Sequence, residues 1–127
     1  MMNYLLIAIA GALGAIARYS LSDISHKMLG WGFPYGTFIV NILGCFAMGF
    51  IMKASLTTTL IPETWRIPLT IGFIGALTTF STFSYETIKL LEDSSYALAM
   101  TNIAANVVLG IAATIAGMAI SKLILGG

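Results

Sequence analysis

The residues of this chain that could do chemistry gather in one short segment, residues 78–85. It reads Thr-Thr-Phe-Ser-Thr-Phe-Ser-Tyr, so six of its eight side chains carry a hydroxyl group. Consecutive Ser and Thr hydroxyls can bond to nearby backbone groups and thereby bend or open a helix. Gly72 and Gly75 add backbone freedom just before them. We therefore expect a broken helix here, whose freed carbonyl oxygens are natural ligands for a hard cation such as Na⁺.

Two aromatic residues, Phe80 and Phe83, interrupt the hydroxyl groups of this segment. They lie three residues apart and can therefore point to the same side. Because the edge of an aromatic ring carries partial positive charge, two ring edges can attract an anion without a full countercharge. Ordinary packing is the commoner reason for such a spacing, and the residues alone leave both interpretations open.

Polar and small residues also recur at helical spacing in two other apolar stretches. One face carries Thr37, Asn41, Gly44 and Met48, and the other carries Asn102, Asn106, Gly110 and Thr114. A hydrogen bond between helices could explain each asparagine. However, two such faces in so small a protein favour a water-filled groove.

Two charged residues, Arg18 and Glu86, lie close to apolar stretches, where charged side chains are functional candidates by default. Arg18 could attract anions at a pore mouth, or its long side chain could simply extend to the membrane interface. Glu86 could pair with Lys89 or Lys53, or could bind a proton. The sequence offers no nucleophile with its base and orienting acid, no metal-ligand cluster and no phosphate-binding loop, so we predict that it is not an enzyme.

The elements that position these residues must lie in a membrane. The chain has 127 residues, of which 58% are hydrophobic and only 9% are charged, with a mean hydropathy of +0.95. An ordinary soluble domain carries about 25% charged residues. The net charge of +1 offers no basic surface for nucleic acid. The single cysteine, Cys45, excludes an intramolecular disulfide and is interpreted as a small packing residue.

Charged and polar clusters divide the chain into four apolar stretches, each long enough to span a bilayer. We predict an all-α membrane protein with one domain over residues 1–127 and a break in the third transmembrane helix. The predicted helices cover about residues 4–21, 34–52, 67–91 and 96–125. No basic segment precedes the first stretch and no small-residue cleavage site follows it, so we expect a mature helix rather than a signal peptide.

The Lys and Arg residues are divided evenly between the two sides of this arrangement. The side that holds the N-terminus carries Lys53, Arg66 and Lys122, and the opposite side carries Arg18, Lys27 and Lys89. Because an excess of Lys and Arg usually marks the cytoplasmic side, an even division predicts insertion in both orientations and an antiparallel homodimer. An accidental even division would look the same. A solute pathway is also built more easily between two such short subunits than within one.

Three motifs in order resemble the Fluc or CrcB fluoride channels along essentially the whole chain. They are Gly11-Ala-Leu-Gly-Ala-Ile-Ala-Arg-Tyr19, Gly36-Thr-Phe-Ile-Val-Asn-Ile-Leu-Gly44 and Gly72-Phe-Ile-Gly-Ala-Leu-Thr-Thr-Phe-Ser-Thr-Phe83, the last followed by Glu86. The resemblance implies antiparallel, dual-topology dimers in the inner (plasma) membrane. Each dimer would contain two pores that export cytoplasmic fluoride passively and so give resistance to fluoride.

The resemblance also implies roles for residues of the pathway. Phe80 and Phe83 would face fluoride with their ring edges, and Asn41 would donate an amide hydrogen to it. Ser81 and Thr82 would add hydroxyl donors. The fourth helix would contribute a polar track that contains Asn106 and Thr114, with Gly110 at a position where family members often carry a hydroxyl.

The remaining implied roles concern a cation and the pore entrance. Carbonyl oxygens of Gly75 and Thr78 from both subunits would hold a structural Na⁺ at the dimer centre, and Arg18 would lie near the vestibule. The family's acid at Glu86 has no role that follows from the residues.

Two other functions remain open at this point. A small proton-coupled multidrug exporter can also be a dual-topology dimer of four-helix subunits. That class needs a membrane-buried carboxylate in its first helix, and the first stretch has none; Glu86 is the only candidate and lies late in the third. A membrane assembly protein without transport activity would explain the glycines but not the segment of hydroxyls and phenylalanines.

Overall fold

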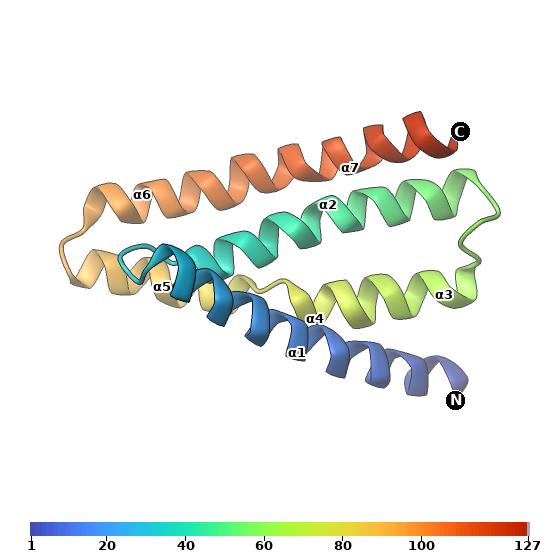
Figure 1. Ribbon diagram of the computed structural model, residues 1–127, viewed down its shortest axis with the longest axis horizontal. Helices are drawn as coiled ribbons and strands as arrows, with labels where there is room; N and C mark the ends of the chain where they lie inside the picture. Colours follow the sequence, from blue (N-terminus) through green and yellow to red (C-terminus); the bar gives the residue numbers. More distant parts are fainter. Residues whose placement is uncertain (127) are drawn as a thin grey trace.

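The computed structural model describes residues Met1–Gly126, and within that range all of the secondary structure is helical (Figure 1). Four helical spans in the described part of the chain are long and apolar enough to cross a membrane. They are α1 (Met2–Leu29), α2 (Tyr35–Thr57), a third span over Glu63–Glu92 and a fourth over Tyr96–Leu125. The prediction of an all-helical protein with four membrane-capable helices is confirmed.

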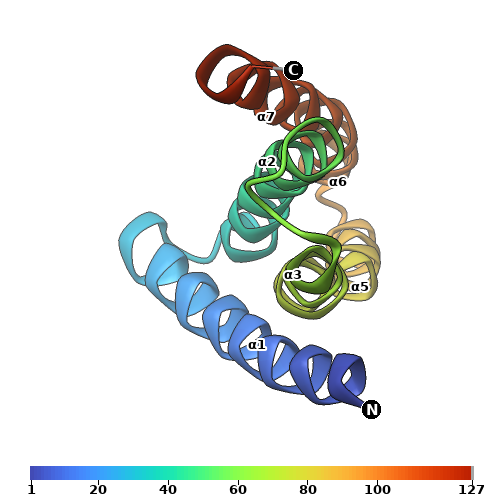
Figure 2. The ribbon, with the colours of Figure 1, turned by 90° about the vertical axis from the view of Figure 1, so that its right-hand side faces the viewer.

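The chain runs back and forth between two ends of this bundle. Figure 1 shows both termini and the connection after α2 at one end, and the other two connections at the opposite end. Viewed along the bundle in Figure 2, α2 lies between α7 and the third span, α6 lies beside α5, and α1 slants across one side. The ends of the four spans are therefore distributed as an alternating membrane topology requires.

The third and fourth spans each contain irregular helix. The third consists of α3 (Glu63–Ile67), the π-helical segment η1 (Pro68–Ile74), α4 (Gly75–Leu77) and α5 (Phe80–Glu92). Thr78 and Thr79 between α4 and α5 have extended backbone, with φ and ψ of −85° and 156° for Thr78 and −150° and 120° for Thr79. The fourth consists of α6 (Tyr96–Ala104), the π-helical segment η2 (Ala105–Leu109) and α7 (Gly110–Leu125). The predicted break in the third helix is confirmed.

The first helix is longer than predicted, because it continues from residue 21 to Leu29. The polar residues that suggested a loop are compatible with a helix at its end. The Ser25 hydroxyl donates to the Leu21 carbonyl at 2.7 Å, and Lys27 pairs with Asp23 at 2.8 Å, one turn apart. Arg18 therefore lies well inside α1 rather than near its end.

Two other predicted bounds also change. The second helix continues past residue 52 to Thr57, because Thr57 and neighbouring residues still satisfy helical hydrogen bonds; the Thr57 hydroxyl donates to the Lys53 carbonyl at 2.7 Å. The third span begins at Glu63 rather than near residue 67. Pro68 is the first residue of η1, which follows directly after α3.

Glycines allow the helices to approach closely. A Cβ atom added to Gly49 on α2 would collide with the backbone of Thr114 on α7, and one added to Gly117 would collide with the Phe46 carbonyl. Gly14 makes the same kind of close approach from α1 to η1. Close backbone contact at small residues is a usual way for transmembrane helices to associate. For these glycines, packing is therefore a sufficient explanation.

Candidate functional site

The break between α4 and α5 is maintained by side chains that replace two helical hydrogen bonds. The Thr79 N–H donates to Asn41 Oδ1 at 2.8 Å instead of to the Gly75 carbonyl. The Thr82 N–H donates to Thr79 Oγ1 at 3.2 Å instead of to the Thr78 carbonyl, which makes Thr79 the N-cap of α5. The carbonyl oxygens of Gly75 and Thr78 therefore lack their usual helical donors four residues ahead.

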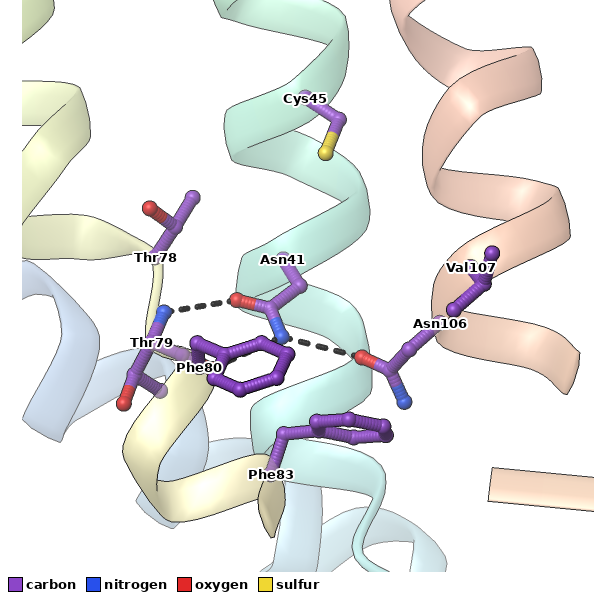
Figure 3. A pocket seen from close by; sticks show the side chains of 8 residues that line it. All are labelled: Asn41, Cys45, Thr78, Thr79, Phe80, Phe83, Asn106 and Val107. Carbon is purple, nitrogen blue, oxygen red and sulfur yellow. Dashed lines mark hydrogen bonds between the residues drawn. The ribbon is translucent and has the colours of Figure 1, made fainter. Parts of the chain in front are cut away.

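A groove of about 220 Å³ lies beside this break (Figure 3). Its walls come from α2, the break itself, the first turn of α5 and η2. They are formed by Asn41, Cys45, Thr78, Thr79, Phe80, Phe83, Asn106 and Val107. The structure thus brings four residues of the predicted anion pathway to one place: Asn41, Phe80, Phe83 and Asn106.

The two phenylalanine rings of the groove form a tilted pair. Their centroids are 5.5 Å apart and their planes make an angle of 51°. The Phe83 side chain is buried, with 8% of its surface exposed, whereas Phe80 is 78% exposed on the single chain. In the view of Figure 3, both rings lie on the opposite side of the Asn41 amide from Cys45. The wall of the groove therefore combines the amides of Asn41 and Asn106 with the two phenylalanine rings, and none of its residues is charged.

The Asn41 amide connects α2 to the helix break and to the fourth span by hydrogen bonds. Its Nδ2 donates to the Thr79 carbonyl at 3.2 Å and to Asn106 Oδ1 at 3.0 Å. A carboxamide nitrogen carries two hydrogens, so both donors of Asn41 are engaged. An anion that binds to the Asn41 amide must therefore displace one of these two acceptors.

The other pathway candidates lie outside this groove. Ser81 is exposed, and its hydroxyl oxygen lies 3.4 Å from Thr79 Oγ1. Thr82 lies in a second cavity of about 300 Å³, whose walls also include Thr37, His26 and Glu86. The structure therefore separates these two hydroxyls from the groove that contains Phe80 and Phe83.

Thr114 and Arg18 are engaged with backbone carbonyls. The Thr114 hydroxyl donates to the Gly110 carbonyl at 3.2 Å, on the part of α7 that packs against Gly49. Arg18 Nε donates to the Ala76 carbonyl at 3.1 Å, just before the break. Arg18 thus binds the end of α4 directly, a role that its predicted place near a helix end did not suggest.

The second cavity contains a histidine whose environment the sequence did not reveal. His26 is buried in the last turn of α1, and its ring stacks on Trp31 with centroids 4.0 Å apart. Its Nε2 accepts from the Gly36 N–H at 3.4 Å, so in the neutral ring Nδ1 donates to the Gly30 carbonyl at 3.1 Å. His26 therefore fastens the connection between α1 and α2.

Glu86 faces the same cavity from α5. Its Oε1 atom is buried and has no hydrogen-bond partner among the described residues. Its neighbour Lys89 pairs with Glu92 at 3.9 Å. Glu86 thus lines a different cavity from the phenylalanine groove.

Comparison with known proteins gives consistent matches over most of the chain. Residues 5–118 match the family model for CrcB-like protein, Camphor Resistance (CrcB). A protein of Geobacter metallireducens named fluoride-specific ion channel FluC is 52% identical over 118 residues, which cover 93% of this chain and 95% of the relative. The FluC of Pelobacter propionicus is 49% identical over 127 residues, covering 100% and 98%. The FluC of Geotalea daltonii is 48% identical over 124 residues, covering 98% and 100%.

Proposed function

Since the chain belongs to the CrcB-like family, we propose that it forms a passive, fluoride-selective channel that lets cytoplasmic fluoride leave the cell. As a family member it is a multi-pass protein of the plasma membrane and a channel protein rather than an enzyme. The observation that carries the proposal is the groove in which Phe80 and Phe83 lie beside the Asn41 amide. Neutral hydrogen-bond donors and ring edges are what a small, strongly hydrated anion can use in place of water.

The groove suggests how fluoride is accepted and released. An arriving fluoride ion replaces Asn106 Oδ1 as the acceptor of the Asn41 N–H. The edges of the two phenylalanine rings supply further positive potential. Neutral groups replace hydration without trapping the ion as a fixed positive charge would. When the ion leaves, the Asn41 N–H donates to Asn106 Oδ1 again. Because the cell interior is electrically negative, the membrane potential drives fluoride outward through this pathway without another energy source.

The functional unit that we propose is an antiparallel dimer with two pores. The Phe80 ring is 78% exposed on the single chain although it belongs to the groove, which fits a groove that a second copy completes. The even division of Lys and Arg fits two opposite orientations in one membrane. Thr82 and Glu86 would lie toward the pore entrance, beyond the phenylalanine pair.

The same dimer would hold one Na⁺ at its centre. The carbonyl oxygens of Gly75 and Thr78 suit a cation, because the N–H groups that would occupy them in a helix donate elsewhere. Carbonyl oxygens are the ligands that hard cations prefer. When bound, Na⁺ would supply positive charge between the two subunits and hold the two breaks together.

The dimer and its sodium site can be tested together. We expect the melting temperature of the purified dimer in detergent to rise when NaCl replaces the chloride salt of N-methylglucamine at equal ionic strength, because a ligand that binds only the folded dimer stabilises it. A monomer in both salts would contradict the dimer. A dimer that melts at the same temperature in both salts would contradict the sodium site.

Ion efflux from liposomes tests the proposed function itself. Liposomes containing the purified protein and loaded with potassium fluoride and potassium chloride are treated with valinomycin, and electrodes record both anions outside. We expect rapid loss of fluoride with no loss of chloride, and no need for a pH gradient. Efflux of fluoride only under a proton gradient would instead support a proton-coupled exporter, with Glu86 as the proton carrier.

A further inference from the structure

A line of hydrogen bonds leaves the helix break, crosses to the fourth span and returns to α5. The Thr79 N–H donates to Asn41 Oδ1 at 2.8 Å, and Asn41 Nδ2 donates to Asn106 Oδ1 at 3.0 Å, as Figure 3 shows. Asn106 Nδ2 then donates to Asn102 Oδ1 at 3.0 Å. The line continues from Asn102 Nδ2 to Thr87 Oγ1 at 3.0 Å and ends with the Thr87 hydroxyl donating to the Phe83 carbonyl at 2.8 Å.

The orientation of every amide in this line is determined by its two ends. The first group is the backbone N–H of Thr79, which can only donate, so the atom of Asn41 that faces it must be oxygen. The last group is the backbone carbonyl of Phe83, which can only accept, so Thr87 must be the donor there. All donors between these ends consequently point the same way along the line.

The two ends of this line of hydrogen bonds lie at the two ends of the segment that carries the phenylalanines. It begins at Thr79, immediately before Phe80, and it ends at the carbonyl of Phe83. Both ends of this short segment are thereby fixed relative to α2 and to the fourth span. Two members of the line, Asn102 and Thr87, thus help to position the groove although they do not belong to its wall.

Within this line of hydrogen bonds, Asn102 fixes the side chain of Asn106, which belongs to the groove wall. Its side chain is completely buried and is not part of the groove wall. Asn106 Nδ2 donates both to Asn102 Oδ1 and to the Asn102 carbonyl, at 3.0 and 2.9 Å. Because both hydrogens of Asn106 are engaged in this way, Asn106 presents only its oxygen to Asn41.

We propose that Asn102 and Thr87 are positioning residues that hold the Asn106 amide with its oxygen toward the groove. This inference rests on the proposed function. With Asn106 held, one donor, the Asn41 N–H, is exchanged between Asn106 and a passing fluoride. If Asn106 were free to turn, its NH₂ group would also donate to the anion, which would then bind more tightly and leave more slowly.

The test compares Thr87→Val and Asn102→Leu with Thr87→Ser in fluoride efflux from liposomes. Valine has nearly the shape of threonine but no hydroxyl, whereas serine keeps the hydroxyl that accepts from Asn102. We expect Thr87→Val and Asn102→Leu to lower maximal flux by at least about fivefold, the factor that corresponds to one hydrogen bond of ordinary strength. The fluoride concentration for half-maximal flux should also fall in both variants, which a general loss of packing would not produce. Thr87→Ser should conduct within about twofold of the unmodified protein.

Nuclear magnetic resonance of the side-chain amides gives a readout that is independent of transport. The chain has Asn3, Asn41, Asn102 and Asn106 and no glutamine, so its NH₂ signals are few enough to assign by substitution. In ¹⁵N-labelled protein in lipid nanodiscs, Thr87→Val should shift the NH₂ signals of Asn106 and Asn41, and Thr87→Ser should leave them nearly unchanged.

The possible failures are distinguishable. Folded Thr87→Val dimers that conduct like the unmodified protein, or a Thr87→Ser variant that is equally impaired, would overturn the inference. If Asn102→Leu does not fold, the two Thr87 variants decide. If the unmodified protein carries no fluoride, the proposed function fails, and the amide signals alone decide whether the line of hydrogen bonds positions Asn106 and Asn41.

Discussion

Fluoride flux through the Phe80→Ile variant is expected to fall at least about tenfold, while the protein remains a folded dimer. Isoleucine is apolar and bulky but has no ring edge, so the substitution removes the positive edge potential and keeps an apolar surface. Phe80 is mostly exposed on the single chain, and its replacement should disturb the fold of the subunit little. Phe83→Ile should reduce flux similarly but should also cost some stability, because Phe83 is buried. Efflux from liposomes and size-exclusion chromatography measure the two effects.

Phe46→Ile provides the matched control for this prediction. Phe46 lies on α2, is 38% exposed and is not part of the groove wall. The same substitution there should leave fluoride flux unchanged. Normal flux through Phe80→Ile would remove the role of the ring edges. Loss of the dimer in this variant would assign Phe80 to packing between subunits instead.

The break in the third helix could be predicted from the sequence because its cause is local. Thr79 caps α5 with its own hydroxyl, and hydroxyls of this kind compete with helical hydrogen bonds wherever they occur in series. The four spans were predictable for the same reason, since length and hydropathy are properties of each stretch separately. Asn41 and Asn106 could be recognised as members of polar faces, although not as partners of each other.

The rest could not be predicted because it depends on contacts between distant segments. Serine, aspartate and lysine mark loops and also occur in helix ends, so residues 22–29 gave no unambiguous end for α1. The burial of His26 depends on Trp31 and Gly36 folding back onto it. The role of Asn102 requires Thr87 on α5 to lie opposite it, 15 positions away in sequence, a contact that the spacing along one helix does not contain.

The Asn41→Asp substitution is expected to reduce fluoride flux about a hundredfold or more, the largest effect of those considered. A carboxylate oxygen can still accept from the Thr79 N–H, so the helix break should persist. The donors to the Thr79 carbonyl and to Asn106 Oδ1 are lost, and a negative charge replaces them in the groove wall. Two like charges about 4 Å apart repel by about 4 kcal/mol at the effective dielectric constant of a protein surface, which disfavours fluoride far more than the loss of one hydrogen bond. Initial rates of fluoride efflux from liposomes measure the effect.

Two further variants test how much of this effect comes from the added charge at position 41, and whether an Asn→Asp change elsewhere in the chain has any effect. Asn41→Leu removes the donors without adding a charge, although it also removes the acceptor of the Thr79 N–H. Its flux should fall less than that of Asn41→Asp and should stay below that of the unmodified protein. Asn3→Asp makes the same chemical change at an exposed position near the N-terminus and should conduct normally. Substantial flux through a folded Asn41→Asp dimer would show that fluoride does not pass the Asn41 amide and would overturn the proposed role of this groove.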